Sequence, residues 1–187
     1  MKILIIGKSD LGKALMSLCP EHDVKIVGRP EYNLLNMEDC KKIVDNYDAD
    51  CIILTQGSVN DINLWNMFTL NYTSAVYLIS EFYNKMLSGQ IIVVSSATVN
   101  WKSWPGIEIN RLAYATAKGA VSDFCQQMNR KNMPGNPEKN ISIQVYEPNN
   151  FISKLNNTSK LDTNIVAQEL LSLVNNPRIS VLQGLNR

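Results

Sequence analysis

Apolar and polar residues alternate in blocks along the chain, and the spacing of the apolar positions differs from block to block. Short continuous apolar runs, many of them β-branched, are typical of strands buried on both faces. Such runs predict strands at Ile3–Ile6, Cys51–Leu54 and Ile91–Val94. An alternating pattern predicts a strand at Ile141–Tyr146, and short apolar-rich segments predict strands at Val24–Val27 and Ile179–Leu182. Longer stretches with apolar residues three or four positions apart predict helices at Leu11–Leu18, Met37–Tyr47, Trp65–Met86, Leu112–Arg130 and Asn164–Asn175.

Strands and helices therefore alternate from one end of the chain to the other. Connections of this length permit crossovers between parallel strands. The pattern predicts an α/β fold with a doubly wound, mainly parallel sheet and helices on both faces, of the Rossmann-like kind. A length of 187 residues suits a single domain spanning residues 1–187.

Composition and charge narrow the range of partners. The chain has 18 Lys and Arg against 17 Asp and Glu, and no long basic run, so nothing indicates binding to nucleic acid or to an anionic membrane. No apolar run approaches the ~20 residues that span a bilayer, and no secretory signal is evident. Four widely spaced cysteines and a single His give no zinc-site spacing. We expect a cytoplasmic protein with reduced, packed cysteines and no metal.

The first strand ends in a glycine turn, Gly7-Lys-Ser-Asp-Leu-Gly12-Lys-Ala14. In folds of this kind that turn commonly holds a phosphate at a helix N-terminus. One reading is a dinucleotide turn, in which Gly12 lets helix and strand pack closely. A second is a P-loop, although Ala14 replaces the Ser or Thr that binds Mg²⁺ there. A third is a turn that binds nothing. The sequence leaves all three open.

The second strand ends in Gly28-Arg29. In a dinucleotide fold, an acid at this place binds the ribose hydroxyls of NAD, whereas a base accommodates the 2′-phosphate of NADP. Arg29 is such a base, and Lys8 supplies a second cation. The alternative is that Arg29 is a solvated surface residue.

Tyr114 and Lys118 lie four residues apart on a predicted helix, which places phenol and ammonium on one face. A free Tyr has a pKa of ~10, and a neighbouring ammonium lowers it toward the range useful for acid–base catalysis. Ser96 follows the preceding strand, so its hydroxyl can reach the same carbonyl group of a bound substrate as the Tyr114 phenol. Asn71 lies on the helix before that strand.

With these motifs in this order, the chain resembles the short-chain dehydrogenase/reductase family over essentially its whole length. The segments that carry the resemblance are Ile91–Ser96, Tyr114–Lys118 followed by Gly119-Ala120-Val121, Phe68–Asn71, Thr55-Gln56-Gly57, Pro148-Asn149 and Asn33-Leu34. The resemblance implies an NADP-dependent oxidoreductase, with NAD as the alternative cofactor, acting on a small carbonyl or alcohol substrate. It also implies a homodimer or homotetramer.

The resemblance further implies a role for each catalytic residue. Tyr114 exchanges a proton with the substrate oxygen, and Lys118 binds the nicotinamide ribose and lowers the Tyr114 pKa. Ser96 polarises the carbonyl, and Asn71 holds a water that connects Lys118 to solvent. The implied cofactor-binding residues are Gly7, Lys8, Ser9, Leu11, Gly12, Arg29, Asn33, Leu34, Thr55, Gln56, Gly57, Tyr114, Lys118, Pro148 and Asn149.

Several positions depart from the family pattern. The glycine turn is one residue short and lacks a glycine, and Asn149 replaces the Gly that usually follows Pro148. The cover over the substrate must be abbreviated, because little chain separates Pro148 from the last helix. Trp101 and Trp104 lie in a long loop beside the site, where they line a substrate pocket or cap the sheet or an oligomer contact. These departures keep a second hypothesis open: an NADP-binding regulatory or sensor protein that has the fold but no activity.

Overall fold

The structure is a computed structural model that describes residues 1–58, 63–96, 109–131, 139–148, 162–176 and 181–183. Its six strands are all parallel and lie in the order β2-β1-β3-β4-β5-β6. The strands are β1 (Lys2–Ile6), β2 (Asp23–Val27), β3 (Cys51–Leu54), β4 (Ser88–Val94), β5 (Asn140–Glu147) and β6 (Val181–Gln183). The predicted fold class is confirmed.

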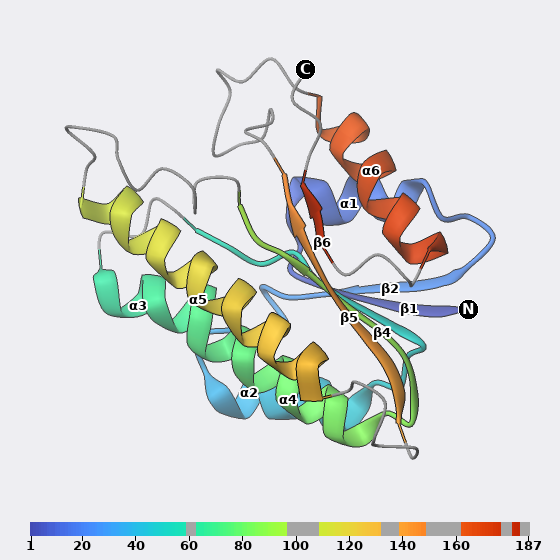
Figure 1. Ribbon diagram of the computed structural model, residues 1–187, viewed down its shortest axis with the longest axis horizontal. Helices are drawn as coiled ribbons and strands as arrows, with labels where there is room; N and C mark the ends of the chain where they lie inside the picture. The colour runs from blue at the N-terminus through green and yellow to red at the C-terminus, as the bar shows by residue number, and fades with distance from the viewer. Residues whose placement is uncertain (59–62, 97–108, 132–138, 149–161, 177–180, 184–187) are drawn as a thin grey trace.

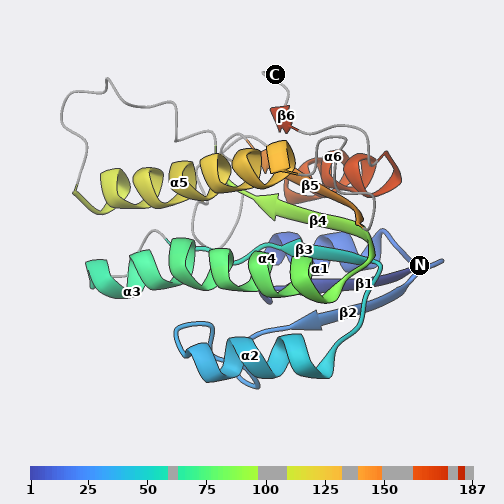
Figure 2. The same ribbon diagram turned by 60° about the horizontal axis from the view of Figure 1, so that its bottom comes forward.

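Helices cover both faces of the sheet (Figures 1 and 2). The helices are α1 (Asp10–Ser17), α2 (Met37–Asn46), α3 (Leu64–Phe68), α4 (Ser74–Lys85), α5 (Ile109–Lys131) and α6 (Thr163–Asn175), and a π-helical turn, η1 (Thr69–Thr73), joins α3 to α4. Figure 1 shows α1 and α6 together on one face, and α2, α3, α4 and α5 on the other. The chain is thus a three-layer α/β structure.

The alternation of side chains along each strand supplies both layers of core. In β1, Ile3 and Ile5 pack under α1 and α6, whereas Leu4 and Ile6 pack under α2, α4 and α5. All four are at most 2% exposed. Strands buried on both faces must be apolar at every position, which is why the continuous runs predicted them correctly.

The strand order changes direction between β1 and β3. From β1 the chain moves outward to β2, and then returns across β1 to begin β3. The loops that leave the carboxyl ends of β1 and β3 consequently diverge, and this is where ligands bind in open α/β sheets. The residues that follow these two strands begin the candidate site.

Candidate functional site

The glycine turn after β1 is fixed by backbone sterics. Gly7 has a φ of +115°, a conformation that side chains rarely adopt, and its amide donates to the Val27 carbonyl at 2.8 Å. A Cβ on Gly7 would lie 2.7 Å from the backbone nitrogen of Gln56. The turn is therefore held against the ends of both β2 and β3, and only glycine fits at its first position.

Helix α1 begins directly after this turn. Ser9 is its N-cap and accepts from the Gly12 amide at 3.1 Å, so Gly12 belongs to the first turn of the helix. A Cβ on Gly12 would lie 2.8 Å from the Gly7 carbonyl oxygen and 3.2 Å from the Ile5 side chain. This is the close helix–strand packing of the dinucleotide reading. The P-loop reading is wrong, because the helix starts at Asp10 and leaves no long loop around a phosphate.

Thr55, at the end of β3, ties the turn together from the other side. Its hydroxyl donates to the Gly7 carbonyl at 2.8 Å and accepts from the Ser9 hydroxyl at 3.1 Å. The side chain is buried. Thr55 therefore holds the glycine turn, and its hydroxyl is already occupied within the protein.

The two cations predicted to bind a 2′-phosphate lie on neighbouring segments. A Cβ on Gly28, which precedes Arg29, would lie 3.1 Å from the Lys8 amide nitrogen. The Arg29 guanidinium donates to the Asn33 side-chain carbonyl through Nε at 3.3 Å and Nη2 at 3.2 Å. Lys8 forms an ion pair with Glu31, and that hydrogen bond lowers the pKa of the Glu31 carboxyl. The structure thus places a carboxylate beside these cations.

Two of the predicted cofactor residues are core residues. Leu11 is buried in the layer beneath α1 and α6, and Leu34 is buried in the opposite layer against α2. The Leu34 carbonyl accepts from the Cys40 thiol at 3.7 Å. Both residues therefore support the loops that carry them, and their side chains are largely covered by the protein.

Lys118 lies on α5, and only 5% of the residue is exposed to solvent. Its ammonium donates to the Gln56 carbonyl and to the Val94 carbonyl, each at 2.9 Å. These carbonyls stand at the carboxyl ends of β3 and β4, so one ammonium joins two strands and a helix. Burial lowers the pKa of Lys118 to about 8. Its two hydrogen bonds leave one N–H without a partner among the described residues.

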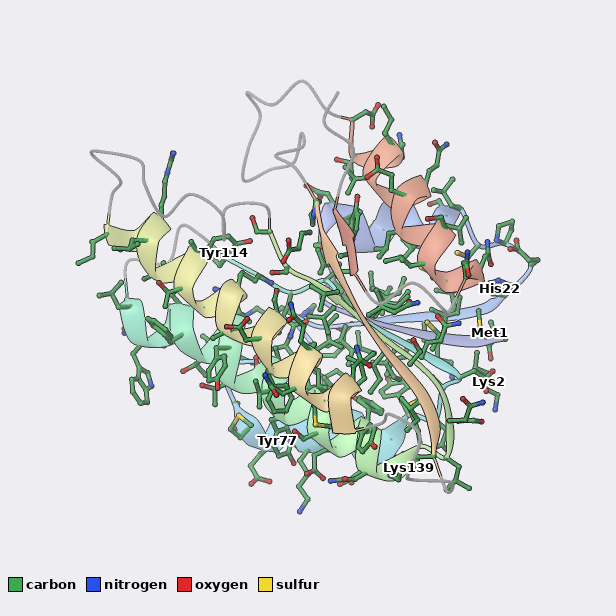
Figure 3. The ribbon with its side chains drawn as sticks, viewed as in Figure 1. Met1, Lys2, His22, Tyr77, Tyr114 and Lys139 are labelled. Atoms are coloured by element: carbon green, nitrogen blue, oxygen red, sulfur yellow. The ribbon has the colours of Figure 1, made fainter. Side chains whose placement is uncertain are left out.

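Tyr114 lies one turn before Lys118, at the end of the molecule toward which the strands point, whereas Met1, Lys2 and Lys139 mark the opposite end (Figure 3). Its phenol is hydrogen-bonded with the Ser96 hydroxyl. Burial raises the pKa of Tyr114 to about 12, and the bond with Ser96 opposes that shift. The proposed catalytic hydroxyls of Ser96 and Tyr114 are thus brought together.

The expectation that Lys118 lowers the Tyr114 pKa is not met in this structure. The ammonium lies 6.0 Å from the centre of the Tyr114 ring. It is held by the two strand-end carbonyls rather than by the phenol. Burial of the phenol is therefore not offset by the neighbouring charge.

Asn71 sits in the π-helical turn η1, which interrupts the long helix predicted over residues 65–86. The extra residue in such a turn is typical of functional sites. The Asn71 amide donates to the carbonyls of Ser58 and Met67, at 3.0 and 2.9 Å, and its oxygen accepts from the Ser58 amide at 3.3 Å. The side chain anchors the loop after β3. Its predicted role of holding a water stays a prediction.

Gly57 lies between Asn71 and Lys118. A Cβ there would lie 3.1 Å from the Asn71 side-chain oxygen and 3.4 Å from the Lys118 ammonium. The neighbouring Gln56 side chain is 6% exposed, and neither its oxygen nor its nitrogen has a hydrogen-bond partner among the residues described. A buried amide without partners is costly, so this position suits an additional hydrogen-bonding group.

These observations test whether a dinucleotide fits. Gly7 and Gly12 bring no side chain to the N-terminus of α1, where the Ser9 hydroxyl caps the helix and Asp10 lies in the first turn. Gln56 supplies a buried amide and Lys118 supplies an N–H at the same edge of the sheet, and neither group has a partner among the residues that the structure describes. The residues present fit the diphosphate and a ribose of such a cofactor.

Some predicted positions cannot be placed. Asn149, Trp101, Trp104 and the abbreviated cover between Pro148 and the last helix lie outside the described residues. Pro148 itself is buried at the end of β5.

Three side chains near Lys118 were not among the predicted site residues. Ser95 directly follows β4, Ser122 lies on α5 and Glu147 ends β5, and all three are buried. The Ser122 hydroxyl lies 2.9 Å from the Ser95 hydroxyl and 3.3 Å from Glu147 Oε1. The signal in the sequence is a Glu at the end of an apolar strand, and a Ser four residues after Lys118 on the same helical face.

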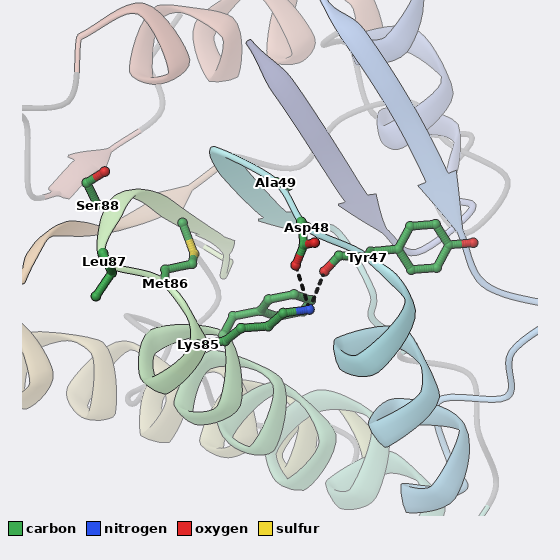
Figure 4. A pocket seen from close by; sticks show the side chains of 8 residues that line it. Tyr47, Asp48, Ala49, Lys85, Met86, Leu87 and Ser88 are labelled. Atoms are coloured by element: carbon green, nitrogen blue, oxygen red, sulfur yellow. Dashed lines mark hydrogen bonds and ion pairs between the residues drawn. The ribbon is translucent and has the colours of Figure 1, made fainter.

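A shallow hollow of about 250 Å³ lies at the opposite edge of the sheet, where α2 and α4 end (Figure 4). Lys85 crosses it, forms an ion pair with Asp48 at 2.8 Å and donates to the carbonyls of Val44 and Tyr47. These bonds satisfy the last carbonyls of α2. The hollow therefore has a structural explanation and is separate from the candidate site.

In the part of the chain that the structure describes, no helix is long and apolar enough to cross a membrane. Nor do the same residues contain a group of three or more His, Cys, Asp or Glu side chains able to hold a metal ion.

The sequence of this chain matches a known protein family. The model of the short chain dehydrogenase family matches residues 54–164, more than half of the chain. The chain belongs to the short-chain dehydrogenase family. The match runs from the last residue of β3 to the start of α6, with Asn71, Ser96, Tyr114 and Lys118, and it omits the glycine turn and Arg29. A search of curated protein sequences finds no match.

Solved structures of other proteins share the fold at low sequence identity. A 3-alpha-hydroxysteroid dehydrogenase from Pseudomonas sp. B-0831, complexed with NADH, is 17% identical with a TM-score of 0.80, over 98% of this chain and 94% of that chain. BdcA in complex with NADPH is 14% identical with a TM-score of 0.78, over 98% and 93%. A dTDP-4-dehydrorhamnose reductase from Bacillus anthracis, in complex with NADP, is 14% identical with a TM-score of 0.77, over 100% and 74%.

Proposed function

We propose that this member of the family is an NADP-dependent oxidoreductase that transfers hydride between the nicotinamide and a small carbonyl or alcohol substrate. The observation that carries the proposal is the convergence of Ser96, Tyr114 and Lys118 at the carboxyl edge of the sheet. Family membership supports the coarser statement, an NAD(P)-dependent oxidoreductase.

Binding would use groups that the fold has already oriented. The diphosphate would lie at the N-terminus of α1, over Gly7. A hydroxyl of the nicotinamide ribose would accept a hydrogen bond from the Lys118 N–H that has no partner among the described residues. The bound nicotinamide supplies the hydride, or accepts it in the reverse direction. The protein's task is then to orient the substrate oxygen and to move one proton.

Ser96 and Tyr114 would perform that task. Both hydroxyls would hydrogen-bond the substrate oxygen, and the Tyr114 phenol would pass its proton to that oxygen as negative charge develops. A Tyr114 pKa of about 12 keeps the phenol protonated at neutral pH, which suits a proton donor. The reverse reaction needs a phenolate, so this state of the site favours carbonyl reduction.

The preference for NADP rests on Arg29 and Lys8. Asn33 orients the Arg29 guanidinium through two nitrogens, and no carboxylate lies at the Arg29 position itself. A guanidinium held in this way is suited to a phosphate monoester. NAD remains the alternative cofactor, because Glu31 pairs with Lys8 at the same corner of the sheet.

The second candidate function is an NADP-binding sensor without activity. The observation that favours it is the high Tyr114 pKa together with the 6.0 Å separation of Lys118 from the phenol ring. A site with this geometry binds a cofactor but does not by itself activate the phenol. Turnover distinguishes the two functions.

We also propose that the chain forms a homodimer through α3 and the start of α5. Large apolar side chains are exposed there, and Trp65 is 78% and Ile109 69% exposed. The others are Leu64, Phe68 and Leu112. Apolar side chains gathered on packed helices are typical of a protein–protein contact. Sedimentation should give a dimer for the wild type and a monomer for Trp65→Asp.

All four cysteines are free and buried, which supports a cytoplasmic location.

The proposed activity is tested with a panel of aldehydes, ketones and keto-sugars. NADPH consumption is followed optically for each of them. The expected result is carbonyl-dependent NADPH consumption, with NADPH bound at least about tenfold more tightly than NADH. Tight NADPH binding without turnover on any substrate favours the sensor. Equal affinity for NADPH and NADH would contradict the NADP assignment alone.

A further inference from the structure

A buried hydrogen-bonded cluster lies directly behind the catalytic turn of α5. Ser95 directly after β4, Ser122 from α5 and Glu147 from β5 are 3%, 5% and 9% exposed. Both serine hydroxyls lie 3.2 Å from the backbone carbonyl oxygen of Lys118. The cluster therefore connects the two strand ends that flank the site to the residue that carries the buried ammonium.

The number of available protons restricts how this cluster is bonded. Ser95 has one described acceptor other than a hydroxyl, the Lys118 carbonyl. If Ser95 donates there, its oxygen accepts from Ser122 at 2.9 Å. The Ser122 oxygen is then left as an acceptor facing Glu147 at 3.3 Å. Every hydrogen-bonding group is satisfied in this order only when the carboxyl group carries a proton.

An ionised Glu147 reverses the order. Ser122 must then give its proton to the carboxylate, and it has none left for Ser95. Ser95 must turn its proton toward Ser122 and release the Lys118 carbonyl, or the two serine oxygens must face each other without a proton at 2.9 Å. Either arrangement weakens the link between β4 and α5.

We propose that Glu147 is a positioning residue for the catalytic turn: it donates to Ser122, Ser122 donates to Ser95, and Ser95 donates to the Lys118 carbonyl. This chain sets the distance between the end of β4, where Ser96 follows, and the turn of α5 that carries Tyr114 and Lys118. The catalytic consequence rests on the proposed function, whereas the hydrogen-bond order does not.

The surroundings of Glu147 support this order. Burial raises the pKa of its carboxyl above the ordinary 4.5, and Ser122 partly opposes the shift. On α5, the Lys118 ammonium points to the Gln56 and Val94 carbonyls, the Tyr114 phenol is hydrogen-bonded with Ser96, and Asp123, next to Ser122, is exposed. The described part of β4 has no titratable side chain. On β5, Tyr146 faces the other layer and donates to Glu169 at 2.6 Å.

The direct test is a pH titration of the Glu147 side-chain carboxyl carbon by NMR in ¹³C-labelled protein, with the signal assigned by its absence in Glu147→Gln. The expected midpoint lies above 4.5, because burial raises the pKa of this carboxyl. A midpoint at or below 4.5 would overturn the proposal. This measurement needs neither cofactor nor substrate, so it stands apart from the proposed function.

Stability provides a second readout. The folded state holds the Glu147 proton more tightly than the unfolded state, so wild-type stability should fall as pH rises from 4.5 to the raised pKa, and then level off. Glu147→Gln keeps a donor toward Ser122 and should not show that fall. An identical pH slope in wild type and Glu147→Gln would contradict the assignment.

The positioning role itself is tested by NADPH affinity. Glu147→Ala should weaken NADPH binding by about fivefold or more, because Ser122 loses its donor, whereas Glu147→Gln should restore wild-type affinity. Equal affinities in all three proteins would contradict positioning. If wild type binds no NADPH, the proposed function fails, and the carboxyl titration still decides the hydrogen-bond order.

Discussion

The two halves of the candidate site are constructed differently. At the ends of β4 and β5, Lys118 and the Ser95–Ser122–Glu147 cluster are buried and joined by hydrogen bonds to strand ends. At the ends of β1 and β2, the glycine turn is tightly packed, but beyond it Arg29 and Glu31 are exposed, and Lys8, which pairs with Glu31, is only half-buried. The family match includes the first half and omits the second.

This difference indicates how well each half of the site tolerates a substitution. Proton transfer needs its groups placed to within a fraction of an ångström, and burial with hydrogen bonding provides that placement. Recognition of an adenosine phosphate needs charge at about the right place, and exposed side chains provide it at little structural cost. We therefore expect the largest effects from changes to the tightly packed turn and the buried groups, and smaller effects from the exposed charges.

The largest effect should come from Gly12→Val. The Cβ position is already 2.8 Å from the Gly7 carbonyl, so a branched side chain must push α1 away from β1. NADPH binding, followed by its fluorescence, should be abolished, and thermal stability should fall. Lys13→Val introduces the same side chain at the next, exposed position and should bind NADPH as wild type does. Normal affinity in Gly12→Val would contradict the account of the turn.

A smaller effect, confined to one cofactor, should come from Arg29→Ala. Loss of a charge-assisted contact with the 2′-phosphate should weaken NADPH binding about tenfold to a hundredfold, and leave NADH binding unchanged. Isothermal titration of both cofactors measures this ratio. A parallel loss for the two cofactors would mean that Arg29 supports the loop rather than the phosphate.

The buried ammonium should give NADPH binding a pH dependence. The pKa of Lys118 is about 8, so its charge is lost as pH rises through that value. NADPH affinity should fall about tenfold between pH 7 and pH 9. Because the folded pKa is below the ordinary 10.5, the free energy of unfolding should rise from about pH 8 to 10.5. Lys118→Met should abolish both dependences, and their persistence would refute the assignment.

The smallest effect should come from Glu31→Gln. This change releases Lys8 from its exposed ion pair, so NADPH affinity should increase by up to about fivefold. Glu38→Gln removes the same charge from an exposed position in the first turn of α2 and controls for net charge. If Glu31→Gln instead weakens NADH binding, Glu31 is an acceptor for ribose hydroxyls, and the cofactor is NAD.

Most of the fold was predictable from the sequence, because strands buried on both faces leave continuous apolar runs. The run Cys51–Leu54 gave β3 with the observed bounds. The π-helical turn around Asn71 was not predictable, since no Gly or Pro marks it. The burial of the Leu34 side chain in the core was not predicted either, because the path of the loop after β2 is not encoded in a local pattern, and its assignment to the cofactor stays a prediction.

The chemistry of the site was predictable only in part. The spacing of Tyr114 and Lys118 placed both on one helical face, as observed. Their pKa shifts depend on how deeply the helix is buried and on which carbonyls the ammonium meets, and neither can be read from spacing. The Lys8–Glu31 ion pair joins residues 23 positions apart, so it depends on tertiary structure alone.

The central claim is that Tyr114 passes a proton to a substrate held beside a bound nicotinamide. The most direct measurement compares wild type and Tyr114→Phe for NADPH consumption with a carbonyl substrate found in the panel, and for NADPH affinity. We predict that turnover falls by at least about 10²–10⁴-fold while NADPH affinity is unchanged, because only the hydroxyl is removed. Turnover that Tyr114→Phe leaves at the wild-type rate would contradict the account.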